Sequence, residues 1–241
     1  PVDEGVRLYQ AGQYNEATAI FRREAEAGNS LAMNDLAVCY AEGKGVPQDF
    51  VEAFHWIKAS AENGYKEAFY PLSGKYANGK GTAKDLEQAR YWAQKAVSEG
   101  SDNAVGAQSL LDQIKTYAGN RLNEGVNHYR EGRFGDAFAA FREAAQAGNV
   151  TAMNNMAACY DNGQGVPQNQ AEAFRWTKAA AEEGYAASYY FLARRYFFGN
   201  GTNVDLAQAK IWAERAVQSS PNFREKAQAL LQSIQNNGAN Q

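Results

Sequence analysis

The sequence predicts an all-α protein, an α-solenoid in which antiparallel helix hairpins stack side by side. The 241 residues include only 5 Pro, so long helical segments are rarely interrupted. Shifting the chain by 120 positions aligns its two halves without a gap, and about 54 of the 120 aligned positions are identical. A shorter period of 36 residues runs inside each half, and this length is typical of helical-hairpin solenoids.

Each half begins with a hairpin that has a tight turn. We expect it over residues 3–27 in the first copy and 123–147 in the second, with Gly12 and Gly132 in the turn. Glycine adopts the positive φ that such a turn requires.

The second hairpin begins with a helix over residues 30–42. Gly43 and Gly45 end this helix, and Pro47 follows where a helix cannot continue. Asp49 is a good N-cap for the next helix, over residues 50–63. The apolar face of the first helix consists of Ala32, Leu36, Ala37 and Tyr40.

The third hairpin repeats this pattern 36 residues later, with Trp92 in the place of Trp56. Pro71 falls inside an early helical turn, where the second copy has Phe191. Because proline has no backbone N–H group, we expect a kink or a late helix start there.

The spacing of apolar residues over 102–117 predicts a lone amphipathic helix that closes the open end of the stack. Seven helices per copy would break the alternation of the hairpins at the join, near residues 117–120. Either the copies are two abutting modules, or residues 102–131 form one long helix. We favour two modules, with domains at 1–118 and 119–241.

The 36-residue pattern resembles Sel-1-like repeats, a branch of the tetratricopeptide superfamily. The pattern reads Ala32-x3-Leu36-Ala37-x2-Tyr40-x2-Gly43-x-Gly45-Val46-x2-Asp49-x3-Ala53-x2-Trp56-x-Lys58-Ala59-x2-Glu62-x-Gly64, with three sister copies. The hairpins at 3–27 and 123–147 look more like ordinary tetratricopeptide units. The resemblance implies a right-handed superhelix that acts as a protein-binding or peptide-binding adaptor. Members of the family serve in bacterial surface assembly, host interaction, inhibition and signalling, so we expect a bacterial protein.

Catalytic motifs are incomplete. The two histidines, His55 and His128, are not equivalent in the repeat. Residues 101–103 spell Ser-Asp-Asn, one element of penicillin-recognising enzymes, but the accompanying Ser-x-x-Lys and Lys-Thr-Gly elements are missing, so we interpret them as helix-capping residues. Residues 74–80 nearly form a phosphate loop, yet Gly81 stands where Ser or Thr must hold magnesium. We therefore predict no catalytic residue, no cofactor and no enzyme.

The two cysteines, Cys39 and Cys159, occupy the same place in the two copies. Stacked helices lie about 8–10 Å apart, so their Cα atoms should exceed the ~7 Å limit for a disulfide. We predict two buried thiols, no disulfide and no metal site.

Charge and hydropathy limit the partners. The net charge of −3 predicts no nucleic-acid binding, and the absence of a long apolar run predicts no membrane insertion. Pro1 in place of Met suggests that a leader has been removed, which points to a periplasmic or secreted protein, although a cytoplasmic location stays open.

Binding residues are expected on the first helix of each hairpin, which lines the concave face in tetratricopeptide-like folds. In the fourth Sel-1-like repeat, residues 189–198 carry more aromatic side chains than one buried face needs. They either line the groove or pack against the terminal helix at 222–236. The predicted binding residues are Asn34, Tyr70, Asn154, Tyr190, Arg194, Phe197 and Phe198. In this superfamily, asparagines such as Asn34 and Asn154 often hold the backbone of an extended ligand.

These features together predict a non-enzymatic scaffold that recognises a protein or peptide in its groove. Three alternatives stay open: an inhibitor or immunity-type partner of one specific protein, an enzyme of cell-wall or β-lactam type, and a self-associating structural protein.

Overall fold

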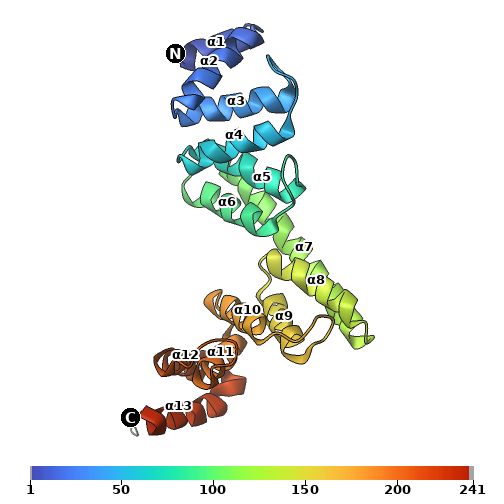
Figure 1. The fold of residues 1–241 in the computed structure, drawn as a ribbon, viewed down its shortest axis with the longest axis vertical. Helices are drawn as coiled ribbons and strands as arrows, with labels where there is room; N and C mark the ends of the chain where they lie inside the picture. The colour runs from blue at the N-terminus through green and yellow to red at the C-terminus, as the bar shows by residue number, and fades with distance from the viewer. Residues whose placement is uncertain (1, 239–241) are drawn as a thin grey trace. The chain divides into compact units, whose positions relative to one another are not determined.

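A computed structural model describes residues 2–238, with side chains described up to residue 236. In this part of the chain helices alternate with short loops, and there is no β-strand. The predicted all-α solenoid of helix hairpins is confirmed (Figure 1). The helices are α1 (Val2–Gln10), α2 (Tyr14–Glu26), α3 (Ser30–Glu42), α4 (Phe50–Glu62), α5 (Phe69–Asn78), α6 (Leu86–Ser98), α7 (Ala104–Arg130), α8 (Phe134–Gln146), α9 (Val150–Asn162), α10 (Gln170–Glu182), α11 (Ala186–Phe198), α12 (Leu206–Ser219) and α13 (Arg224–Gly238). Two 3₁₀ turns, η1 (Lys66–Ala68) and η2 (Pro221–Phe223), precede α5 and α13.

The helices pair as hairpins. In the first part of the chain α1 packs on α2, α3 on α4 and α5 on α6, and in the second part α9 packs on α10 and α11 on α12. Neighbouring hairpins pack through α2 and α3, and through α10 and α11. Each hairpin thereby buries an apolar face that it could not bury alone.

The chain forms two compact units, and the boundary between them falls between Ile114 and Lys115, inside α7. The expected lone helix at 102–117, with a break near 117–120, is wrong: residues 104–130 form one continuous helix, the other alternative. The reason is that Gly119 is the only helix-weakening residue near the join at 117–120, and a glycine inside a helix costs only about 1 kcal/mol. The proposed domain limits of 1–118 and 119–241 stay a prediction.

The helix ends follow the predicted chemistry. Asp49 caps α4, because its Oδ1 accepts the N–H groups of Val51 at 2.8 Å and Glu52 at 3.1 Å. Gly43 ends α3 in the left-handed conformation, with φ at 70°. Pro71 coincides with a late helix start: the 3₁₀ turn η1 comes first, and α5 begins at Phe69.

The cores of the hairpins combine alanine with large side chains. In the first unit a cluster of Ala17, Phe21, Ala32, Leu36 and Cys39 is buried, and the second unit has the equivalent Ala137, Phe141, Ala152, Met156 and Cys159. Alanine allows the helices to approach closely, and the larger side chains fill the remaining space. Both cysteines are free thiols inside these clusters.

Candidate binding cleft

A cleft of about 280 Å³ lies in the second unit, against α9 and α11. These are the first helices of their hairpins, where the concave face was expected. Polar side chains on its lining are Asn154, Asp161, Gln170, Thr177, Arg194, Arg195 and Asn200, and the apolar ones are Ala157, Ala158 and Phe191.

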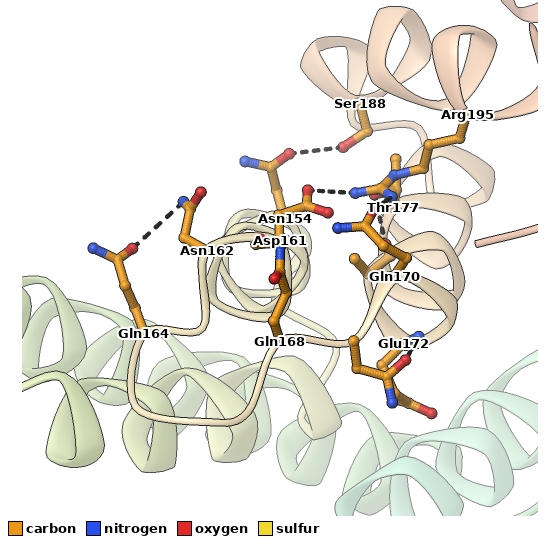
Figure 2. Close-up of polar contacts among 12 residues, drawn as sticks. Asn154, Asp161, Asn162, Gln164, Gln168, Gln170, Glu172, Thr177, Ser188 and Arg195 are labelled. Atoms are coloured by element: carbon orange, nitrogen blue, oxygen red, sulfur yellow. Dashed lines mark hydrogen bonds and ion pairs between the residues drawn. The ribbon is translucent and has the colours of Figure 1, made fainter. Parts of the chain in front are cut away.

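A buried arginine organises this cleft. The side chain of Arg195 is only 8% exposed, and it donates from Nε to Thr177 Oγ1 at 3.0 Å (Figure 2). Its two Nη groups donate to Gln170 Oε1 at 3.5 Å and to a carboxylate oxygen of Asp161. Thr177 in turn donates to the backbone oxygen of Ala173 at 2.7 Å. The guanidinium charge is therefore paired and its position is fixed by three helices.

Asn154 is held by the next hairpin. Ser188 Oγ donates to Asn154 Oδ1 at 3.1 Å, so the first helices of two successive hairpins are linked by side chains (Figure 2). This hydrogen bond fixes the orientation of the amide group. The Nδ2 group of Asn154 is its hydrogen-bond donor and can donate to a ligand.

Arg194 lines the same cleft and lies beside two aromatic rings just outside its lining. Its Cζ atom is 5.8 Å from the ring centre of Tyr190 and 5.8 Å from that of Phe198. The side chain of Arg194 is exposed, and Phe198 is 55% exposed. Among residues 2–236, no carboxylate forms an ion pair with Arg194. Its charge is thus available to a ligand.

The surplus aromatic residues serve two roles. Tyr190 stacks on Phe223 of η2, with ring centres 5.4 Å apart, and is half-buried. Phe197 packs on the core of the last two hairpins and against Phe198. Packing against the terminal segment therefore accounts for Tyr190, whereas Phe198 and Arg194 remain on the surface. Binding by any of these residues stays a prediction.

The predicted binding residues of the first unit are Asn34 and Tyr70. Asn34 Nδ2 donates to Asp35 Oδ1 at 3.3 Å, and the ring of Tyr70 packs against Gly106, where an added Cβ would lie only 3.0 Å from the ring. Lys75 takes the place of Arg195, and burial together with the neighbouring Lys80 lowers the pKa of its ammonium group.

The buried arginine network escaped the sequence analysis. A signal was present at four of the many positions where the two copies differ. Ala41, Phe50, Ile57 and Lys75 in the first copy become Asp161, Gln170, Thr177 and Arg195 in the second. Their joint change from mostly apolar to polar residues marks a site, but only the fold shows that they touch.

Other candidate chemistry resolves into structural roles. Ser101, just ahead of α7, donates from Oγ to Glu67 Oε2 at 2.9 Å and accepts the N–H group of Asn103 at 3.1 Å. Helix capping by residues 101–103 stays a prediction. Over the described residues, no group of three or more His, Cys, Asp or Glu side chains could hold a metal ion. Within residues 2–238, no helix is both long enough and apolar enough to cross a membrane.

Three known proteins are similar to this chain over part or most of its length. The chitin synthase regulator SKT5 of Malassezia restricta is 35% identical over 132 residues, which are 50% of this chain but only 9% of that protein. The solved Sel1 repeat protein from Oxalobacter formigenes is 26% identical, with 91% of this chain and 85% of that chain covered and a TM-score of 0.41. A protective antigen of uropathogenic Escherichia coli with an SLR fold is 27% identical over 92% of this chain and 52% of its own, with a TM-score of 0.47.

The Sel1 repeat family model matches residues 30–65, 72–101, 150–185 and 186–220. These four repeats cover more than half of the chain. Proteins built from Sel1 repeats are generally non-catalytic scaffolds that mediate protein interactions. On the strength of these four matches, the chain belongs to the Sel1 repeat family.

Proposed function

We propose that this chain is a non-enzymatic adaptor that binds an extended segment of another protein in the cleft of the second unit. The observation that carries the proposal is the preorganised lining of this cleft, in which the buried Arg195 and the linked Asn154 are fixed beside the exposed Arg194. Outside the lining, the exposed ring of Phe198 lies next to Arg194. Fixed polar groups next to an exposed aromatic ring are the usual components of a peptide-binding surface.

The cleft chemistry favours binding over catalysis. Its hydroxyl group, on Thr177, donates to Ala173 O and accepts from Arg195, so no base is positioned to activate it. The bacterial origin suggested by the family resemblance stays a prediction, because the curated relative is fungal.

A selection from a library of random 12-residue peptides tests the proposal. We expect enriched peptides to bind the chain, and to bind the double variant Asn154→Ala, Phe198→Ala at least about tenfold more weakly, since such anchors each contribute more than about 1 kcal/mol. The control is Val51→Ala, at an exposed position on α4 of the first unit. Peptide binding that ignores the cleft variant, or no enrichment at all, would contradict the proposal.

A further inference from the structure

The charges of the cleft do not cancel. Its charged lining residues are Asp161, Arg194 and Arg195. Asp161 pairs with Arg195, and no described carboxylate pairs with Arg194. The lining therefore carries one unbalanced positive charge, on a chain whose formal net charge is −3. A positive cleft selects negatively charged groups.

Arg195 is closed to a ligand. Its side chain is 8% exposed, and its Nε and both Nη groups already donate to Thr177, Gln170 and Asp161. A ligand anion thus has one receptor at this cleft, the guanidinium of Arg194.

Arg194 suits a carboxylate on a peptide. The guanidinium can donate two parallel hydrogen bonds to a carboxylate, and Asn154 and Asn200 line the same cleft as amide donors for a peptide backbone. Phe198, which lies beside Arg194 and is 55% exposed, supplies apolar contact area for the neighbouring residue of the peptide.

The first unit has no counterpart of this receptor. Gly74 stands at the position of Arg194, and Ala77 and Asn78 stand at those of Phe197 and Phe198. Selectivity for a negative group should therefore belong to the second unit alone.

We infer that the segment bound in the proposed cleft is acidic, with an Asp or Glu side chain that pairs with Arg194 and an apolar or aromatic neighbour that contacts Phe198. This inference rests on the proposed function and specifies its ligand. The acidic group distinguishes it from a neutral or basic peptide of the same length.

The frequency of each residue type among selected 12-residue peptides tests the inference. For the native chain we expect Asp and Glu to be enriched over the unselected library. Replacing Glu by Gln in an enriched peptide should weaken binding about tenfold, because a charge-assisted hydrogen bond is lost. The effect should shrink as salt is added, since the charge of Arg194 is exposed.

The variant Arg194→Glu should reverse the preference, so that Lys and Arg are enriched instead. The matched control is Arg215→Glu, an exposed arginine over the ring of Trp212 on α12, which should leave the acidic preference unchanged. Circular dichroism of both variants checks that the helices are retained.

Two kinds of failure can be told apart. One outcome is that peptide binding is weakened by the cleft variant Asn154→Ala, Phe198→Ala, but the peptides show no preference for Asp and Glu, or the preference persists in Arg194→Glu. This outcome overturns the inference and leaves the proposed function standing. Peptides that bind independently of the cleft, or a failed selection, overturn both.

Discussion

At the scale of single residues, Arg195 is the side chain whose loss of partners should destabilise the fold most. A buried guanidinium is tolerated only when an anion and hydrogen-bond acceptors surround it. Arg195 has Asp161, Thr177 and Gln170 as such partners. The first copy reaches the same fold with Lys75 among Ala41, Phe50 and Ile57, so the network is not a requirement of the repeat.

Replacing Asp161 by alanine should therefore destabilise the protein. The buried charge of Arg195 would lose its anion, at a cost that we expect to be about 1–3 kcal/mol, below the usual range for fully buried pairs, because Asp161 is 35% exposed. Urea unfolding measures this free energy. The matched control is Asp136→Ala, whose partner Arg133 is 50% exposed, and which should cost at most about 1 kcal/mol.

A double variant separates the charge from the packing. Asp161→Ala with Arg195→Leu removes both charges, so it should be less destabilised than Asp161→Ala alone. Equal or greater destabilisation of the double variant would mean that Arg195 acts mainly through the volume that it fills.

The thiol groups of Cys39 and Cys159 should be unreactive in the folded chain. Burial raises the pKa of Cys159 to about 11 and also raises the pKa of Cys39. The reactive thiolate is therefore scarce at neutral pH and becomes more abundant as the pH rises toward the raised pKa. Iodoacetamide at neutral pH should modify both cysteines in urea and neither under native conditions, as mass spectrometry would measure. Modification of the folded protein at the rate of a free thiol contradicts this account.

At the scale of the hairpin, the second glycine of each Gly-x-Gly loop lets that loop lie directly against the backbone of the preceding hairpin. A Cβ atom at Gly81 would lie 1.8 Å from the backbone oxygen of Phe50, and one at Gly201 would lie 1.9 Å from that of Gln170. Phe50 and Gln170 are the first residues of α4 and α10, the second helices of the preceding hairpins. Only glycine allows the loop to approach that backbone.

We expect Gly81→Ala to destabilise the chain more than Gly64→Ala. Both glycines have a positive φ, 83° and 82°, so both substitutions cost about 1–2 kcal/mol of backbone strain. The site of Gly64 is open, with nothing within 4 Å of an added Cβ, whereas at Gly81 the loop must also move away from Phe50. Thermal unfolding compares the two variants. Equal melting temperatures of the two variants would show that the close approach of the loop to Phe50 does not contribute to the stability of the fold.

The loops also show how far the sequence could predict the fold. It placed the end of α3 at Gly43 and the cap of α4 at Asp49, because these depend on residues close in sequence. It did not predict what the second glycine touches, since that contact joins two hairpins. It missed the role of Arg195 for the same reason: the partners of Arg195 come from α9 and α10, and Arg195 lies on α11.

The candidate binding residues illustrate the same limit. The sequence identified residues 189–198 as unusually aromatic, but it could not divide them between packing and surface. That division depends on Phe223, which stacks on Tyr190 from a segment more than 30 residues away. Phe198 and Arg194 have no comparable cover, and they remain the strongest candidates for contact with a partner.

At the scale of the whole molecule, α7 is the feature that two separate modules would lack. This helix of 27 residues contains the division between the two compact units. Gly119 lies inside it, with nothing outside its own helix within 4 Å of an added Cβ, so a substitution there acts on the helix alone. Cys39 lies in the first unit and Cys159 in the second, which gives each unit its own buried reporter.

An unbroken α7 should couple the unfolding of the two units, as expected for nearest neighbours in a repeat array. In the natural chain we expect Cys39 and Cys159 to become reactive at the same urea concentration. Gly119→Pro removes a hydrogen bond from the helix interior at a cost of about 3 kcal/mol, so the two labelling midpoints should separate. Gly119→Ala is the matched control: it should keep the midpoints together and raise stability by up to about 1 kcal/mol. Distinct midpoints in the natural chain, or coincident ones in Gly119→Pro, would show that α7 joins the units in sequence without coupling their stability.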